Sequence, residues 1–160
     1  MPDTKARPQG LDSAFARALI KYGGRVQVRV YRLTGGRVGG RWRIGAGLRR
    51  PVPTLLLDHV GRTSGRRYTI PLLYLLDGPN VVVVASSGGM RRHPQWYRNL
   101  QAHRDTRVQI RSEVREVRAR TATPDEKAVL WPRLVELYAD FERYQSWTER
   151  EIPVVVLEPR

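Results

Sequence analysis

The chain has 160 residues, of which 41% are hydrophobic and 28% charged, enough for one globular domain with its own core. It has no cysteine and only three scattered histidines, which excludes disulfides and thiolate metal sites, and we expect no metal site. No apolar run approaches the about 20 residues that span a bilayer, and no signal peptide is recognisable, so a cytoplasmic location is expected.

Positive charge is concentrated in the first third of the chain. The formal net charge is +14, and residues 1–50 hold twelve Lys or Arg side chains against two acidic ones. Codon bias toward arginine would explain the count but not this asymmetry. The excess favours an anionic partner, namely nucleic acid, an acidic membrane surface or a polyanionic cofactor. No nucleic-acid motif is present, so nucleic acid is not an expected partner.

The N-terminal 50 residues are predicted to form a basic, partly helical arm. A short helix is expected from Asp12 or Ser13 to Tyr22, ended by Gly23 and Gly24. Its amphipathic pattern suits either a membrane surface or packing on its own domain. Residues 26–33 (VQVRVYRL) fit a strand or a helix equally well. A glycine- and arginine-rich connection over 35–47 then predicts a boundary between the arm, 1–50, and a folded domain, 51–160.

The rest of the chain reads as strands joined locally, with helices inserted between them. Strands are expected over 54–60, 67–76, 80–86, 106–112, 114–121 and 152–157, with a turn at 61–66. One helix is expected over 94–103. A second is expected to begin at a capping box formed by Thr123 and Glu126, and a third to cover 142–147. Local connections favour antiparallel pairing, and a small barrel removes the exposed sheet edges. The predicted fold is therefore mainly β with helices, a closed or partly closed barrel of about six strands.

Two polar turns carry candidate binding chemistry. Gly61–Arg66 (GRTSGR) offers backbone amides, two hydroxyls and two guanidinium groups, which suit a phosphate, although a solvated hairpin turn would look the same. Ser86–Gly89 (SSGG) ends a hydrophobic strand and leads into HPQWY. Glycines there would let a ligand approach the backbone, and the following helix start suits an anion. The alternative is an ordinary loop and a helix that fills the core.

Four aromatic residues follow one another at intervals of three, at positions 138, 141, 144 and 147. On a helix they would lie near one face and would serve either as core or as the wall of a ligand pocket. Tyr138 and Tyr144 carry phenol groups, which can hydrogen-bond to a developing oxyanion or protonate it.

Together these segments resemble the deazaflavin-dependent nitroreductase family of actinobacteria. The motifs that carry the resemblance are, in chain order, GRTSGR, IPLLYLLDG, VVVASSGG, HPQWYRNL, ATPDEKAVLWPRLVELY and YQSWTEREIPVVVLEP, with YRLTGGRVGG more loosely before them. The resemblance implies a split β-barrel related to flavin-binding pyridoxamine-phosphate oxidases, coenzyme F420 as the cofactor, and a helical 26–33 segment. It also implies quinone reduction and an arm that can contact the inner face of the membrane.

The resemblance also implies which residues form the site. The cofactor contacts would be Arg62, Thr63, Ser64, Tyr68, Thr69, Ile70, Pro71, Leu72, Leu73, Val84, Ala85, Ser86, Ser87, Gln95, Trp96, Tyr97, Arg98, Asn99 and Phe141. As a separate hypothesis about mechanism, Ser86 would hydrogen-bond the ring or the acceptor and Tyr138 and Tyr144 would flank the acceptor, so these three are the candidate catalytic residues.

The expected activity is hydride transfer from reduced F420 to a small planar acceptor, which would be a quinone, another activated double bond or a nitro compound. Leu73 and Phe141 stand where prodrug-activating family members have tyrosines, which argues against nitroimidazole reduction. Two alternatives remain at this stage: an FMN-binding split barrel, and a non-catalytic F420- or lipid-binding protein at the membrane. The sequence leaves the oligomeric state open.

Overall fold

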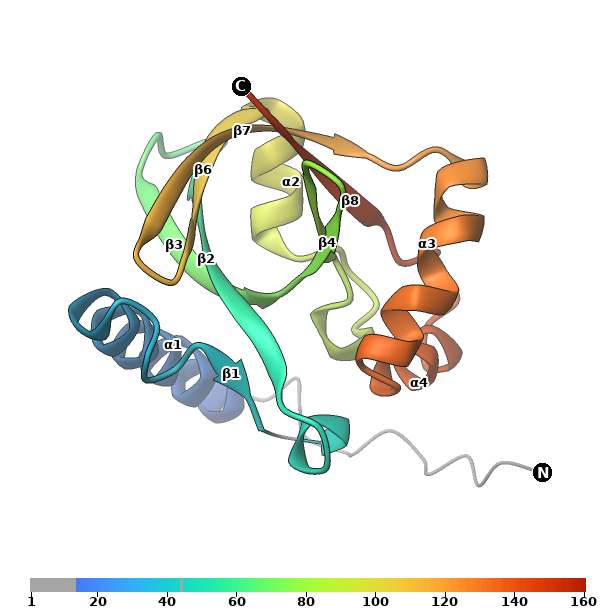
Figure 1. Cartoon of the computed structure of the whole chain (residues 1–160), viewed down its shortest axis with the longest axis horizontal. Coiled ribbons are helices and arrows are strands. Elements are labelled where there is room, and N and C mark those ends of the chain that lie inside the picture. Colours follow the sequence, from blue (N-terminus) through green and yellow to red (C-terminus); the bar gives the residue numbers. More distant parts are fainter. Residues whose placement is uncertain (1–13, 44) are drawn as a thin grey trace.

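An eight-stranded antiparallel sheet curls into a barrel at the centre of the molecule (Figure 1). The computed structural model describes the backbone of residues 14–43 and 45–160, and the side chains from residue 23 onward except residue 44. The strands are β1 Arg41–Trp42, β2 Val52–Val60, β3 Arg67–Leu73, β4 Leu75–Asp77, β5 Asn80–Val84, β6 Asp105–Ile110, β7 Glu113–Thr121 and β8 Val154–Pro159. They follow the order β1-β2-β6-β7-β8-β5-β4, and β3 pairs with the other side of β2.

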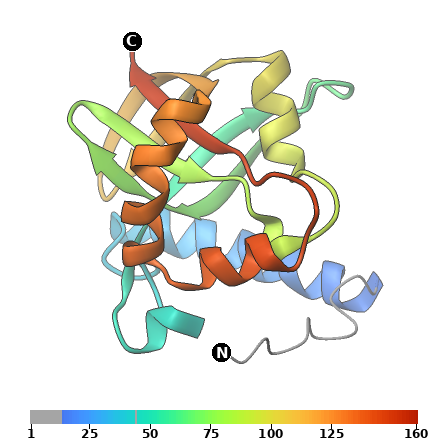
Figure 2. The ribbon, with the colours of Figure 1, turned by 90° about the vertical axis from the view of Figure 1, so that its right-hand side faces the viewer.

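Helices surround the barrel on several sides. They are α1 Ala14–Thr34, α2 Gln95–Ala102, α3 Pro124–Leu137 and α4 Asp140–Ser146, with 3-10 turns at Gly45–Leu48 and Ser87–Gly89. Figure 1 shows α1 and the α3–α4 pair on different sides of the barrel, and Figure 2 shows α4 beside the segment that follows β5. The capping box expected at the start of α3 is confirmed, because Thr123 Oγ1 accepts from Glu126 N and the Glu126 carboxylate accepts from Thr123 N. Among the described helices, none is both long enough and apolar enough to cross a membrane.

The core has an inner part and two outer parts. The inner cluster fills the barrel with alternate residues of the strands, such as Leu55, Leu57, Val83 and Val155, and α2 closes it with Trp96. Val82, Val84 and Val156 point to the opposite face, where α3 and α4 cover them. A small third cluster joins α1 to β2. The antiparallel barrel with helices therefore agrees with the fold class predicted from the sequence, because period-two alternation separates the two faces of each strand.

The first helix is longer than expected, and the predicted stop at Gly23 and Gly24 is wrong. The backbone stays helical through both glycines to Thr34, which confirms the helical 26–33 segment. Val28 and Tyr31 of this later half pack on Leu56 of β2, and Tyr31 is 0% exposed. This burial offsets the roughly 1 kcal/mol that each glycine costs inside a helix. The expected start at Asp12 or Ser13 lies outside the described residues.

Two strand boundaries also differ from the expectation. The strand predicted over 67–76 is divided at Tyr74, because β3 pairs with β2 as far as Leu73 whereas β4 pairs with β5. The last strand is Val154–Pro159 rather than 152–157. The N–H of Ile152 bonds to the Gln145 side chain instead of a neighbouring strand. The arm–domain boundary at residue 50 stays a prediction, although β1 from the predicted arm pairs with β2.

Candidate functional site

The barrel is split between β3 and β5. The two strands come together near Tyr74, where the chain passes from β3 to β4, and β4 pairs with β5 from Leu75 to Asp77. Beyond that point β3 follows β2 while β5 follows β8, so among the described pairings none joins β3 to β5. The wide end of the split therefore lies between the 61–66 turn, which precedes β3, and the Ser86–Gly89 segment, which follows β5.

The 61–66 turn is held against the first turns of α2. Arg62 donates from Nη1 to Gln95 Oε1 at 2.7 Å and to Asn99 Oδ1 at 3.2 Å. The backbone N–H of Arg62 bonds to the same Asn99 oxygen. Three of the predicted cofactor residues, from segments more than 30 positions apart, thus meet at one corner of the split. This arrangement fixes the guanidinium before any ligand binds.

Asn99 is itself held by a histidine that we did not predict. Asn99 is 4% exposed, and its amide nitrogen lies 2.9 Å from His59 Nδ1. The His59 ring stacks on Tyr68, with ring centroids 5.4 Å apart. Burial lowers the pKa of His59, and the neighbouring Asp58 opposes part of that effect. Asn99 therefore joins His59 to the Arg62 turn.

The end of β5 is held by Arg150, another residue that the sequence did not single out. Its guanidinium donates to the carbonyl oxygens of Ala85, Ser86 and Met90, with the shortest bond, 2.7 Å, from Nη2 to Ser86. Burial lowers the pKa of Arg150, and no acidic side chain of the described residues pairs with it. Arg150 therefore shapes the loop that follows β5 and places a positive charge beneath it.

The Ser86–Gly89 segment follows an unusual backbone path. Ser87, Gly88 and Gly89 have φ values of 47°, 60° and 75°, which is the left-handed region. A Cβ at Gly89 would lie 2.8 Å from the Tyr144 carbonyl oxygen, so only glycine permits α4 to come this close. A Cβ at Gly88 would meet nothing within 4 Å. The backbone of Ser87 is thus strained in the left-handed region, and the surface beside it at Gly88 is open. Backbone strain of this kind is common at ligand sites.

His93 lies at the same corner, just before α2. Its Nδ1 is 3.2 Å from Arg150 Nη1, and its ring centroid is 5.2 Å from that of Tyr97. Since arginine can only donate, Nδ1 accepts and the remaining ring proton is on Nε2. Burial lowers the pKa of His93, with smaller contributions from Arg150 and Arg98. The imidazole is therefore a neutral donor in this place.

Two of the three predicted catalytic residues form a hydrogen-bonded chain. Trp42 Nε1 donates to the Tyr138 hydroxyl at 3.3 Å, and the Tyr138 and Tyr144 hydroxyls are 3.3 Å apart. Tyr138 is 2% exposed, whereas Tyr144 is partly exposed. Burial raises the pKa of both phenols. Either hydroxyl can donate to the other, and Trp42 adds a donor to the Tyr138 oxygen.

The predicted residues of β3 divide between the two faces of the strand. Tyr68, Ile70 and Leu72 lie on the inner face, opposite His59, Leu57 and Leu55. Thr69, Pro71 and Leu73 lie on the outer face. Thr69 donates to Asp58 and accepts from Arg32 of α1, away from the other candidates. The side chains of the two sets point to opposite faces of the strand, so one planar ligand cannot touch both sets of side chains. A ligand that contacts residues of both sets would have to lie along the backbone edge of β3.

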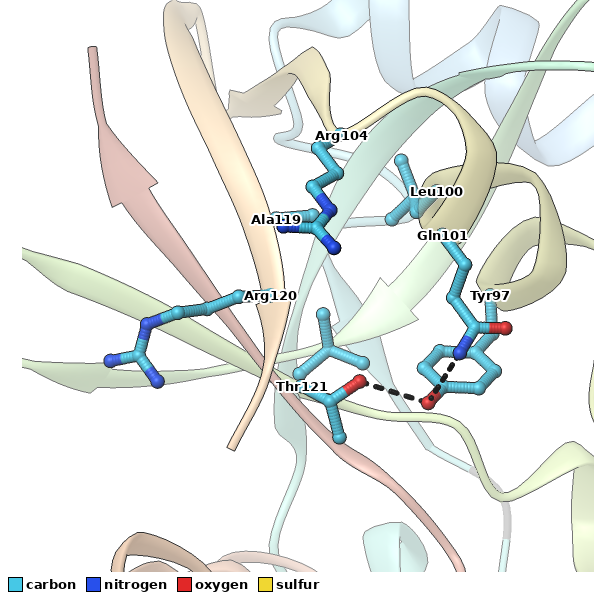
Figure 3. Close-up of a pocket in the computed structure, with 8 residues that line it drawn as sticks. Tyr97, Leu100, Gln101, Arg104, Ala119, Arg120 and Thr121 are labelled. Carbon is cyan, nitrogen blue, oxygen red and sulfur yellow. Dashed lines mark hydrogen bonds between the residues drawn. The ribbon is translucent and has the colours of Figure 1, made fainter. Parts of the chain in front are cut away.

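The remaining predicted residues are mostly core. Trp96, Tyr97 and Ala85 belong to the inner cluster, and Val84 and Phe141 belong to the outer one. Figure 3 shows the Tyr97 hydroxyl turned toward Thr121 Oγ1, 2.9 Å away, and Gln101 at 3.2 Å, in a pocket of about 340 Å³ between α2 and β7. Thr63, Ser64, Gln95 and Arg98 are exposed, and Ser86 is buried with no hydrogen bond to its hydroxyl from the described residues.

Sequence reasoning missed His59, Arg150 and Trp42. For His59, the sequence offered only a weak signal, namely that a histidine occupies an alternating position of a predicted strand. No local signal distinguishes Arg150 in a chain so rich in arginine, although it lies inside the last recognised motif, YQSWTEREIP. Trp42 comes from the predicted arm, and only the fold brings it to Tyr138.

Comparisons with known proteins agree with the motifs. The family model described as F420H2-dependent quinone reductase matches residues 23–159. Rv3178 of Mycobacterium tuberculosis, which carries this family's name, is 58% identical over 118 residues, covering 74% of this chain and 99% of that protein. The F420H2-dependent quinone reductase Rv1261c of the same organism is 37% identical over 139 residues, covering 85% of this chain and 89% of that protein.

The solved structures lead to the same family. A structure described as the F420-H2 dependent reductase FDR-A has a TM-score of 0.62 and 34% identity, and covers 66% of this chain and 94% of that chain. The chain therefore belongs to the F420H2-dependent quinone reductase family, which confirms the F420 cofactor and the F420H2-dependent reductase activity expected from its motifs.

Proposed function

We propose that the protein transfers a hydride from reduced F420 to a quinone at the wide end of the split between β3 and β5. The observation that carries this proposal is a set of contacts between the predicted segments: Gly89 packs on Tyr144, Arg150 binds the Ser86 carbonyl and His93 just before α2, and Arg62 binds Gln95 at the start of α2. The family description and the names of its relatives support a quinone as the acceptor.

The residues present suit an anionic, planar cofactor. Arg62 is already oriented, and the nearby Arg66, Arg67 and Arg98 are exposed and have no acidic partner among the described residues. These cations would hold the phosphate and glutamate tail of F420, because guanidinium groups make forked bonds to such oxygens. The ring would lie against the open backbone at Gly88. When bound, F420 supplies the hydride, while the protein supplies orientation and electrostatics.

The side chains around the acceptor would manage its charge. The Ser86 hydroxyl has no partner in the described chain and would hydrogen-bond the ring or the acceptor. Tyr144, the more exposed of the two, would donate a proton to the acceptor oxygen, and Tyr138 would position it through the hydrogen bond between the hydroxyls. Both phenols are protonated at neutral pH, and burial, which raises their pKa, leaves each a weaker acid than a free tyrosine.

Substitution of Tyr138 and Tyr144 tests the proposed role of their phenol groups at the acceptor. We expect Tyr144→Phe to lower kcat by about 100-fold or more, the size of a lost general acid, while the Kd for F420 stays within about twofold. Tyr138→Phe should have a smaller effect. Trp42→Phe removes only the first donor of the chain, and Trp131→Phe, whose N–H bonds to Glu142, is its matched control.

An unchanged kcat in the Tyr138→Phe, Tyr144→Phe double variant would remove the phenols from the mechanism. Titration with F420 and with FMN tests the cofactor itself. Binding of FMN without binding of F420 would overturn the proposed site.

A peripheral contact with the membrane would bring a lipid-soluble quinone to this site. It is supported by Val26 and Leu33 of α1, which are 62% and 87% exposed on a helix that also carries Arg25 and Arg29. Co-sedimentation with anionic vesicles, with and without Leu33→Ser, measures this contact. Equal binding by both proteins would exclude the α1 surface from it.

A further inference from the structure

A second basic hollow lies where the α1–β1 connection meets the barrel. Its volume is about 620 Å³, and no acidic residue lines it. Four arginines do so, three from residues 37–43 and one from the β6–β7 turn. The lining residues used below are Gly36, Gly40, Arg37, Arg41, Arg43, Thr54, Tyr74 and Arg111.

The walls of this hollow are fixed by one buried phenol. The Tyr31 hydroxyl donates to the Thr54 carbonyl at 2.9 Å and accepts from the Arg111 backbone N–H at 2.9 Å. It therefore ties α1 to the start of β2 and to the β6–β7 turn. Because Tyr31 is wholly buried, this junction is part of the folded core and does not depend on exposed contacts.

The α1–β1 connection approaches the β6–β7 turn very closely. A Cβ at Gly36 would lie 2.9 Å from Arg111 Cα and 3.0 Å from Tyr31 Cζ, and Gly36 has a φ of 74°. No other residue fits there without moving the backbone. The glycines singled out in the sequence thus serve to place Arg37, Arg41 and Arg43 on one side of the hollow and Arg111 on the other.

Arg111 occupies a strained backbone position. Its φ is 56°, at the first position of the two-residue turn between Ile110 and Glu113, where glycine or asparagine is favoured. Such strain persists where the surroundings impose it and is often associated with function. Here the strained residue brings a guanidinium to the hollow.

The cations of this hollow are not neutralised by the protein. No acidic side chain of the described residues forms an ion pair with Arg37, Arg41, Arg43 or Arg111. The buried Thr54 Oγ1 also has no hydrogen-bond partner. Burial raises the pKa of Tyr74, so its hydroxyl remains a donor. The four guanidinium groups and the hydroxyls of Thr54 and Tyr74 can therefore donate hydrogen bonds to a ligand with several negatively charged oxygens.

We propose that this hollow binds a phosphate-bearing anion, such as a diphosphate or a phosphate ester. It lies away from the Arg62 turn, because Thr54 and Val60 stand near opposite ends of β2, roughly 20 Å apart at 3.3 Å per residue. The connection from Gly35 to Arg43 and the β6–β7 turn form the site, which adjoins only Leu73 among the predicted cofactor contacts, since Leu73 pairs with Thr54.

Arg111→Gly is the decisive variant, because glycine suits the φ of 56° and the substitution removes the guanidinium side chain without adding backbone strain. We expect pyrophosphate to bind the wild-type protein saturably in isothermal titration at 0.15 M NaCl. Arg111→Gly should weaken this binding by about tenfold or more, the size of one charge-assisted hydrogen bond. Its Tm without pyrophosphate should be unchanged or higher, because the strain is relieved. Arg104→Gln, which removes an exposed arginine after α2, should bind as the wild type does.

A second arm identifies the source of the phosphate. Vesicles with phosphatidylglycerol are compared with phosphatidylcholine vesicles, and binding that depends on Arg111 without pyrophosphate binding would assign the site to lipid headgroups. Absence of any Arg111-dependent binding, or an equal loss in Arg104→Gln, would overturn the proposal. F420 titration of Arg111→Gly should match the wild type within about twofold. A parallel loss of F420 affinity would instead make the hollow part of the cofactor site.

Discussion

The two ends of β2 both carry positive charge, but the protein treats that charge differently. Beyond Val60, Arg62 is held by Gln95 and Asn99, and Arg150 is held by three carbonyl groups. Near Thr54, the arginines have no acidic partner among the described residues, although Tyr31 fixes the walls around them. At the end of β2 beyond Val60, which we call the cofactor end, the arginine side chains are thus held in place before a ligand binds. At the end near Thr54, which we call the arm end, only the backbone is held in place. The arginines of the charge-rich first third thus lie at the arm end, although the same part of the sequence contributes Trp42 to the Tyr138–Tyr144 pair.

The largest effect is expected from removing the support at the cofactor end. Arg150→Met leaves the carbonyls of Ala85, Ser86 and Met90 without their donor, so the unfolding free energy should fall by about 3 kcal/mol. The Kd for F420 should rise by about tenfold or more, because the loop after β5 loses its shape. Urea denaturation and fluorescence titration measure the two effects.

Two further variants separate charge from geometry at this position. Arg150→Lys keeps the charge but loses the fork, so it should fall between the wild type and Arg150→Met. Arg143→Met removes an exposed arginine that pairs only with Asp140 and should cost less than about 1 kcal/mol. A wild-type F420 affinity in folded Arg150→Met would show that the cofactor end does not rely on this support.

A smaller effect is expected at the arm end. Tyr31→Phe removes the hydroxyl that joins Thr54 to Arg111 and should lower the unfolding free energy by about 1–2 kcal/mol. Pyrophosphate binding should weaken while F420 binding stays near the wild-type value. Loss of F420 affinity in this variant would contradict the independence of the two ends.

The smallest expected effect is a dependence of stability on pH. Burial holds the pKa of His59 below its usual 6.5, so between the two values the unfolded chain binds more protons than the folded one. Stability should be complete above pH 6.5 and should fall as the pH drops toward the lowered pKa. His59→Gln should flatten this slope in thermal unfolding between pH 7.5 and 5, measured roughly every half unit. His93 acts with the same sign, so the slope should be reduced and not abolished.

Much of the fold could be predicted because its signals are local. A run of valines marked β5, and Val117 and Ala119 alternating with polar residues marked β7. Thr123, Pro124 and Glu126 marked the start of α3. The stop at Gly23 and Gly24 failed because packing of Tyr31 on β2 outweighs glycine's poor helix propensity. The division at Tyr74 could not be seen, because it depends on which neighbour each half of the strand pairs with.

The candidate site was predictable only in part, for a related reason. The 61–66 turn and the Ser86–Gly89 segment were visible as clusters of glycine and polar residues, and the family motifs joined them to F420. Asn99 and Thr69 were assigned as direct contacts, but their side chains are engaged by Arg62 and His59, and by Asp58. Their contact with the cofactor stays a prediction.

The sequence by itself determined the antiparallel barrel, the family and the F420 chemistry, because periodicity, caps and motifs are properties of neighbouring residues. Only the tertiary structure decided where the barrel splits, that Arg150 and His59 support the site, and that Trp42 reaches Tyr138. It also placed the arginines of residues 37–43 beside Arg111, far from the cofactor turn. These contacts join residues distant in the chain, and strand register and helix packing, which no local pattern encodes, bring them together.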